Sequence, residues 1–355
     1  MENDVLPFSH RTLILKIRNL YSSQMSILNG KRTLITGGAG FIGSHLVDIL
    51  MKNNCNVRVL DNLSSGRIEN IERWKGKENF KFIYGDILNA EIVEKTVKDC
   101  EVIFHLAANP EVRLSSTNPE IHFNQNVMAT YTLLEAIRKT GSVEILVFTS
   151  SSTVYGDAEE MPTPEEASTK PISVYGACKL ACEALIHSYA KTYGFKAAIL
   201  RLANIIGSRS RHGVIHDFII KLMKNPNELE ILGDGMQVRS YIYIDDAIEA
   251  TMIAYNNIGA YNFTIYNIGS EDYITVKDVA DIITSALKLR NVKYIYKPIA
   301  HGIGWYGDVK RIALKIDKIM KLGWKPKLSS REAVRLTVHQ KLSLIHISEP
   351  TRPRL

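Results

Sequence analysis

The chain has 355 residues, of which 45% are hydrophobic and 23% charged, so intrinsic disorder, collagen and a disulfide scaffold are excluded. It contains no run of about 18 apolar residues, and we expect no transmembrane helix and no membrane partner. Its four cysteines form no Cys-x-x-Cys pair and no cluster with histidine, which argues against a metal site and favours a reduced, cytoplasmic protein.

The amino-terminal segment 1–24 differs from the body of the chain, because the first strand-like run begins only at Lys31. It has no clean apolar stretch followed by a small-residue cleavage site, so a secretory signal is not expected. We interpret residues 1–24 as an upstream extension and Met25 as the natural start. A transit peptide is the alternative, since Arg11, Lys16 and Arg18 stand among few acids.

From Lys31 onward, short β-branched runs alternate with longer amphipathic stretches. Strands are predicted over 32–36, 57–61, 80–84, 102–106, 145–149 and 197–202, and helices over 42–53, 90–99, 119–140, 174–193 and 213–224. This order predicts an α/β fold in which a doubly wound parallel sheet of the Rossmann type occupies residues 25–203. Ligands of such sheets bind at the carboxyl ends of the strands.

Beyond residue 204 the alternation loosens. Helices near 245–256 and 275–288 and strands near 241–244, 264–268 and 293–297 predict a smaller C-terminal α/β lobe over 204–341. Residues of about 234–268 are expected to return in part to the first domain.

The net charge of +7 is concentrated in this lobe, because residues 288–335 contain 13 Lys or Arg and 3 Asp or Glu. Two interpretations of this charge are possible: a solvated lysine-rich surface, or a lobe that attracts an anionic substrate. The sequence contains no nucleic-acid-binding motif, and no nucleic acid partner is expected.

The last segment, 342–355, contains LSLIHISEPTR, which resembles the translation of a transposon-end sequencing adapter. We expect it to be a tail outside the natural fold and dispensable, like residues 1–24. A frayed natural tail is the alternative.

A glycine-rich motif, TGGAGFIG, joins the first predicted strand to the first helix. Gly37, Gly40 and Gly43 allow backbone N–H groups to approach a pyrophosphate at the helix N-terminus, although a merely tight turn would use the same residues. Asp61 ends the second strand, where a carboxylate accepts both ribose hydroxyls and repels the 2′-phosphate of NADP, which indicates NAD. Asp86 follows the third strand and either meets the adenine or caps the next helix.

A second group of motifs indicates the chemistry. Ser151 lies in TSSSTVYG after the fifth strand, and Tyr175 and Lys179 are spaced i, i+4 on a predicted helix, so both point the same way. Alone, that spacing is typical of a solvated helix face. Beside a dinucleotide loop it indicates an acid–base pair, in which Lys179 and the nicotinamide charge are expected to lower the pKa of Tyr175.

Together, TGGAGFIG, Asp61, SSSTVYG and Tyr175-x-x-x-Lys179 resemble the extended short-chain dehydrogenase/reductases, over about residues 31–340. Within them, the chain is most similar to nucleotide-sugar epimerases of the UDP-glucose 4-epimerase type, especially archaeal ones. The resemblance implies an NAD-binding Rossmann domain, a sugar-nucleotide lobe and a homodimer. The implied catalytic residues are Ser151, Tyr175 and Lys179.

The resemblance also implies binding residues. For NAD these are Gly37, Gly40, Phe41, Ile42, Gly43, Asp61, Asn62, Ser64, Gly66, Asp86, Ile87, Leu106, Ala107, Ala108, Asn126, Tyr175 and Lys179. For the nucleotide-diphosphate sugar they are Ser151, Asn204, Val214, Arg239 and Asp308, with Arg239 on the diphosphate and Asp308 on the ribose.

The chain departs from the family pattern at three places. Ile303 or Trp305 stands where the family usually has an arginine, Pro110 replaces a frequent lysine, and Cys178 a frequent serine. Related dehydratases and decarboxylases carry an acid where this chain has Ser152 and Thr153.

The implied reaction is therefore epimerisation at sugar carbon 4 through a 4-keto intermediate. The alternatives are a dehydratase or decarboxylase, an epimerase that prefers UDP-N-acetylhexosamine or UDP-uronic acid, and a non-catalytic NAD-sensing module. Such modules commonly lose the tyrosine or the lysine, and this chain keeps both.

Overall fold

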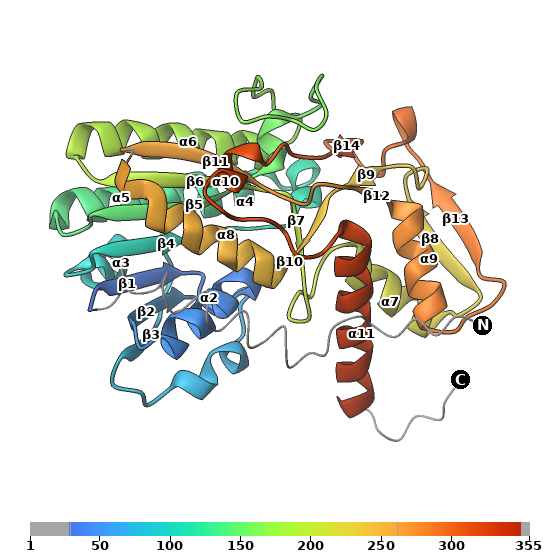
Figure 1. Cartoon of the computed structure of the whole chain (residues 1–355), viewed down its shortest axis with the longest axis horizontal. Coiled ribbons are helices and arrows are strands. Elements are labelled where there is room, and N and C mark those ends of the chain that lie inside the picture. Colours follow the sequence, from blue (N-terminus) through green and yellow to red (C-terminus); the bar gives the residue numbers. More distant parts are fainter. Residues whose placement is uncertain (1–27, 29, 261, 349–355) are drawn as a thin grey trace.

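The centre of the protein is a seven-stranded sheet in which every strand is parallel to its neighbours. The computed structural model describes residues 28, 30–260 and 262–348 (Figure 1). The strand order is β11-β6-β5-β4-β1-β2-β3. The strands are β1 Arg32–Thr36, β2 Asn56–Asp61, β3 Phe80–Tyr84, β4 Val102–His105, β5 Ile145–Ser151, β6 Lys196–Leu202 and β11 Phe263–Ile268.

Both faces of the sheet are buried, because successive strand residues point to opposite sides. Ile35 and Phe104 pack in the hydrophobic core on the side of α2 (Phe41–Lys52) and α8 (Ile244–Asn257). Their neighbours Leu34 and Ile103 pack in a second core with helices of the other face. Those helices are α3 Ala90–Val97, α5 Ala129–Thr140 and α6 Val174–Tyr193. This double burial explains why the strands read as nearly continuous apolar runs.

The predicted helix over 119–140 is not a regular α-helix along its length. It begins as α4 (Pro119–His122), passes through a π-helical segment (Phe123–Met128) and continues as α5. The remaining short helical turns are η2 Ile68–Asn70, η3 Glu72–Trp74, η4 Val112–Ser116, η6 Ser152–Tyr155, η7 Ile258–Ala260 and η8 Ala300–Gly302.

The C-terminal lobe carries three small sheets beside the carboxyl edge of the main one. β7 pairs with β10, β8 with β13, and β9 with both β12 and β14. Their bounds are β7 Asn204–Ile206, β8 Glu228–Leu232, β9 Val238–Arg239, β10 Tyr241–Tyr243, β12 Ile274–Thr275, β13 Lys293–Lys297 and β14 Arg311–Ile312. The lobe's helices are α7 Val214–Lys224, α9 Val276–Ala286, α10 Asp317–Met320 and α11 Ser330–Ser348. Within the described residues, none of the helices combines the length and apolar character needed to cross a bilayer.

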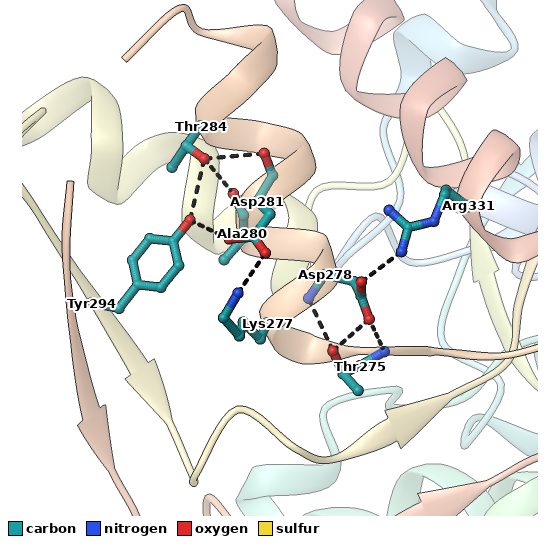
Figure 2. Close-up of polar contacts among 8 residues, drawn as sticks. All are labelled: Thr275, Lys277, Asp278, Ala280, Asp281, Thr284, Tyr294 and Arg331. Atoms are coloured by element: carbon teal, nitrogen blue, oxygen red, sulfur yellow. Dashed lines mark hydrogen bonds and ion pairs between the residues drawn. The ribbon is translucent and has the colours of Figure 1, made fainter. Parts of the chain in front are cut away.

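A network of polar contacts on α9 connects the elements of this lobe (Figure 2). Thr275 and Asp278 form a capping box at the start of the helix, and Arg331 of α11 pairs with the same Asp278. One turn later, Asp281 accepts a hydrogen bond of 2.9 Å from the hydroxyl of Tyr294 in β13. These contacts attach α9 to α11 on one side and to β13 on the other.

The boundary that we expect at residue 342 lies inside α11. The helix continues to Ser348, and Leu342 and Ile345, three residues apart on one face, pack against the hydrophobic core. The first residues of the predicted tail, 342–348, are therefore part of a helix. Residues 1–24 lie outside the described residues.

Candidate active site

A cavity of about 540 Å³ lies where the carboxyl ends of the strands face the C-terminal lobe. Its lining includes segments that follow β1, β2, β3, β4, β5 and β6, together with residues of the lobe. All the predicted site residues except Gly66 and Asn126 line this cavity: Gly37, Gly40, Phe41, Ile42, Gly43, Asp61, Asn62, Ser64, Asp86, Ile87, Leu106, Ala107, Ala108, Ser151, Tyr175, Lys179, Asn204, Val214, Arg239 and Asp308.

The glycine-rich loop is too tightly packed for larger residues. Gly37 has a φ of +71°, and a Cβ there would lie 2.8 Å from the backbone nitrogen of Ala107. A Cβ on Gly43 would lie 2.2 Å from the carbonyl oxygen of Gly37. Gly40 caps α2 without a side-chain acceptor for the first-turn N–H groups. The loop thus brings exposed backbone donors to the cavity, as binding of a dinucleotide pyrophosphate requires.

Asp61 holds this loop in place as well as facing the cavity. Its carboxylate accepts hydrogen bonds from the backbone N–H groups of Ala39 (2.9 Å) and Leu63 (2.8 Å), and burial raises its pKa. Gly66 lies behind it, since a Cβ there would be 3.0 Å from both carboxylate oxygens. Gly66 therefore contacts Asp61 rather than the cavity.

Asp86 is not the cap of α3, so that alternative is wrong. The cap is Asn89, whose side chain accepts from the Ile92 N–H. Asp86 instead accepts from the Leu88 N–H at 2.8 Å and from the Asn62 amide at 2.9 Å. Both residues thereby form one polar rim at the ends of β2 and β3.

Asn126 is buried in the π-helical segment behind the cavity wall. Its amide oxygen accepts a hydrogen bond of 3.2 Å from the backbone N–H of Asn109, just beyond the cavity-lining residues Ala107 and Ala108. It supports the segment after β4 rather than lining the cavity.

Helix α6 positions the predicted acid–base pair. Ser173 caps the helix, and the next turn carries Tyr175 and Lys179, both buried. The Lys179 ammonium donates to the Thr149 carbonyl oxygen at 2.8 Å and lies 6.0 Å from the centre of the Tyr175 ring. Ser151, at the end of β5, lines the same part of the cavity.

In the protein without cofactor, burial shifts the pKa values of this pair so that the neutral forms of Tyr175 and Lys179 are both favoured. Burial raises the pKa of Tyr175 to about 12, although a hydrogen bond with Ser151 acts in the opposite direction. Burial also lowers the pKa of Lys179 to about 8. In the protein without bound NAD, desolvation of the phenolate thus outweighs the Ser151 hydrogen bond, whereas the expected lowering includes the nicotinamide charge and stays a prediction.

On the lobe side, two predicted substrate residues bind each other. Arg239 and Asp308 form a buried ion pair of 2.6 Å, and Asp308 also accepts from the Gly304 N–H at 3.1 Å. Gly213, with a φ of +83°, caps α7 without a side-chain acceptor, so Val214 opens a helix at the cavity. Asn204 lies in the same wall at the start of β7.

Several residues that line the cavity were not predicted from the sequence as site residues. Trp305, Gln237 and Thr337 each have a buried polar atom without a hydrogen-bond partner among the described residues. Arg209 and Lys341 add positive charge to the same wall. No motif marks these residues, although Trp305 was one of two candidates for the place of the family arginine.

The parallel sheet, the glycine loop and the buried tyrosine–lysine pair on one cavity define a dinucleotide-dependent enzyme of the short-chain dehydrogenase/reductase class. More specifically, the chain belongs to the NAD dependent epimerase/dehydratase family, whose model matches residues 33–269. NAD is the cofactor of that family, and the loop geometry at Gly37 and Gly43 fits it.

Several known proteins resemble this chain over most of its length. A Methanocaldococcus jannaschii protein provisionally named UDP-glucose 4-epimerase is 37% identical over 311 residues, which cover 86% of this chain and 97% of that protein. A crystal structure of UDP-galactose 4-epimerase is 45% identical with a TM-score of 0.78, covering 88% of this chain and 99% of the other. UDP-N-acetylglucosamine 4-epimerase from Methanobrevibacter ruminantium is 32% identical with a TM-score of 0.78 and the same coverage.

Proposed function

We propose that this enzyme epimerises a nucleotide sugar at carbon 4, with UDP-glucose and UDP-galactose as its substrate pair. The observation that carries the proposal is that Ser151, Tyr175 and Lys179 line one cavity together with the dinucleotide loop and the Arg239–Asp308 pair. The relatives named above, which carry epimerase names for UDP sugars, support the same assignment.

Each catalytic residue has a distinct part in this reaction. Bound NAD supplies a reversible hydride acceptor for sugar carbon 4 and a positive charge that favours ionisation of a nearby phenol. Tyr175 takes the proton of the sugar 4-hydroxyl on its phenol oxygen and later returns it. The Lys179 ammonium stabilises the phenolate, and Ser151 hydrogen-bonds the reacting oxygen. Burial excludes water from the pair, which strengthens these interactions.

The cavity favours epimerisation over dehydration or decarboxylation, because its carboxylates already have partners. Asp61 and Asp86 accept hydrogen bonds from backbone N–H groups. The other three form ion pairs, namely Glu111 with Arg113, Asp217 with Lys221 and Asp308 with Arg239. Beside Ser151 the chain places Ser152 and Thr153, neither of which can act as an acid for elimination.

The test is a panel of sugar nucleotides incubated with the purified enzyme without added NAD, with products separated by chromatography. We expect the 4′-epimer of UDP-glucose, with no loss of water or carbon dioxide. A 4-keto-6-deoxy product, or a pentose product from UDP-glucuronic acid, would instead assign the dehydratase or decarboxylase alternative.

The same panel tests tolerance of N-acetylated sugars. Ile312 of β14 lines the cavity and pairs in register with Arg239 of β9. A bulky aromatic residue at this place would narrow the cavity, and isoleucine leaves more room for a substrate. We therefore expect UDP-N-acetylglucosamine to be epimerised too, and Ile312→Tyr to reduce that activity more than activity on UDP-glucose.

We also propose a cytoplasmic homodimer. The four cysteines are free and buried, which suits a reducing compartment. Exposed apolar side chains on the π-helical segment, α5 and α6, namely Phe123, Met128, Tyr131 and Tyr193, offer a surface for a second copy. Light scattering after size exclusion measures the mass, and a monomer would reject this part of the proposal.

A further inference from the structure

Lys341 is a buried cation without an anionic partner among residues 28, 30–260 and 262–348. It lies on α11, is 7% exposed and lines the cavity. Its ammonium donates a hydrogen bond to the carbonyl oxygen of Ser210, and none of the described residues forms an ion pair with it. Burial and the charge of Arg211 lower its pKa to about 8. An unpaired buried charge is costly, so such a group indicates a missing anion.

Arg209, on the loop that contains Ser210, has a carboxylate partner, unlike Lys341 of α11. Arg209 pairs with Asp48 of α2 at 2.6 Å and donates to the hydroxyl of Ser44 at 2.9 Å. The charge of Arg209 therefore attaches the loop to α2. The charge of Lys341 can instead interact with a ligand in the cavity.

Thr337, one turn before Lys341, is a second unsatisfied group on the same face of α11. It is 1% exposed, its hydroxyl has no hydrogen-bond partner among the described residues, and it also lines the cavity. A buried hydroxyl without a partner is destabilising for the protein alone. Within the described part of the chain, two successive turns of α11 thus present an ammonium without a counter-ion and a hydroxyl without a hydrogen-bond partner.

The loop that Lys341 contacts runs from β7 to the start of α7 and also touches the start of α2. At one end, Gly207 lies against the ring of Phe41, the first residue of α2, where a Cβ would come within 3.2 Å. At the other end, Gly213 caps α7. Both helix starts line the cavity, and both offer first-turn N–H groups to a phosphate.

We propose that Lys341 and Thr337 are ligand-binding residues, which α11 contributes to the cavity to hold a phosphate of a nucleoside diphosphate. The inference rests on the proposed function, because both the dinucleotide and the sugar nucleotide carry such a diphosphate. Which of the two supplies the phosphate is decided by separate binding measurements.

The experiment uses the full chain and four variants. Lys341→Gln removes the charge, Lys341→Arg keeps it, and Thr337→Val removes only the hydroxyl. Lys325→Gln is the control, because it removes an exposed charge of the same lobe, paired with Glu271 at 3.1 Å and outside the cavity lining. Calorimetry with UDP reports the substrate side. The NAD content of the purified protein and titration with NADH report the cofactor side.

Lys341→Gln should weaken one of these two affinities about 10-fold to 100-fold, and the other by less than twofold. Lys341→Arg should restore it. Besides Arg211, the titratable groups that act on Lys341 are His212 and His216, whose pKa values burial lowers, so both are neutral near pH 8. The affinity of the wild type should therefore fall as pH rises through 8, and both Lys341 variants should lose that dependence. Thr337→Val should weaken the same ligand without lowering the unfolding temperature, since no hydrogen bond of the unliganded protein is lost. Lys325→Gln should change neither affinity.

Unchanged affinities in Lys341→Gln, with a wild type that binds UDP and NADH, would overturn this inference and leave the proposed function intact. The role of Lys341 would then be to tie α11 to the Ser210 loop. A wild type that binds neither ligand would overturn both.

Discussion

Arg239 and Asp308 neutralise each other in the cavity wall, at a distance of 2.6 Å and with Asp308 2% exposed at its side chain. The pairing of β14 with β9 brings them together. It places Ile312 opposite Arg239, and Asp308 lies in the loop just before β14. The second terminal nitrogen of the guanidinium, Nη1, donates to the carbonyl oxygens of Val238 and Lys310. The guanidinium is thus fixed before any ligand binds.

Asp308→Ala should destabilise the protein by about 3 kcal/mol, because it leaves a buried guanidinium without its counter-ion. It should also weaken UDP binding, since Arg239 loses its fixed orientation. Urea unfolding and calorimetry measure the two effects. Glu228→Gln is the control, because its pair with Lys293 is exposed and should change stability by less than about 1 kcal/mol. Equal effects would contradict this account of the pair.

Tyr175→Phe should lower turnover by at least about 10²–10⁴-fold, because it keeps the ring and removes the group that moves the proton. NAD content should stay unchanged, since the glycine loop and Asp61 are untouched. Steady-state kinetics and analysis of nucleotide released from the denatured protein provide both numbers. Full activity of the variant would place the base elsewhere.

Lys179→Ala should reduce both turnover and NAD retention, because its ammonium serves the phenolate and lies in the same cavity as the cofactor loop. Ser151→Ala should be milder, since it removes one hydrogen bond and leaves the base. The comparison of kcat with NAD content across the two variants tests this division. A Ser151 variant that is as inactive as the Tyr175 variant would require a larger role for the serine.

Asp61→Ala should weaken NAD binding by about 1.5–3 kcal/mol, because a charged hydrogen-bond acceptor is lost. The structure adds that the unfolding temperature should fall as well, since Asp61 holds the backbone N–H groups of Ala39 and Leu63. Calorimetry with NAD and NADP and a thermal melt measure these effects. A wild type that prefers NADP would show that Asp61 does not select the cofactor.

His105 should make the protein sensitive to acid. It is fully buried between the hydroxyls of Thr36 and Thr130, and burial lowers its pKa to about 3. In the unfolded chain His105 binds a proton below its ordinary pKa of about 6.5, whereas in the native protein it stays neutral down to about pH 3. The free energy of unfolding therefore falls as the pH falls through this range.

Between pH 7 and pH 5 this residue should lower the free energy of unfolding by about 2 kcal/mol. His105→Gln keeps polar atoms for both threonines and cannot titrate, so it should remove that part of the loss. Urea unfolding at the two pH values gives the difference between variant and wild type. Identical losses in both proteins would exclude His105 as the cause.

Local patterns in the sequence were enough for the main sheet and the cofactor loop. The strands around Ile35 and Phe104 are recognisable because residues buried on both faces of a parallel sheet form apolar runs. The glycine loop is recognisable because Gly37 and Gly43 have no room for a side chain. The i, i+4 spacing of Tyr175 and Lys179 follows directly from the geometry of a helix.

Long-range contacts were decided only by the tertiary structure. The sequence suggested separate ligands for Arg239 and Asp308, which are 69 residues apart, yet the fold pairs them with each other. It carried no sign that Lys341 and Thr337 of α11 reach the cavity. Burial, too, is a tertiary property: it raises the pKa of Tyr175 in the protein without cofactor, an effect that the spacing to Lys179 does not reveal. Sequence spacing determines which side chains share a face, whereas desolvation and counter-ions depend on what the folded chain packs around them.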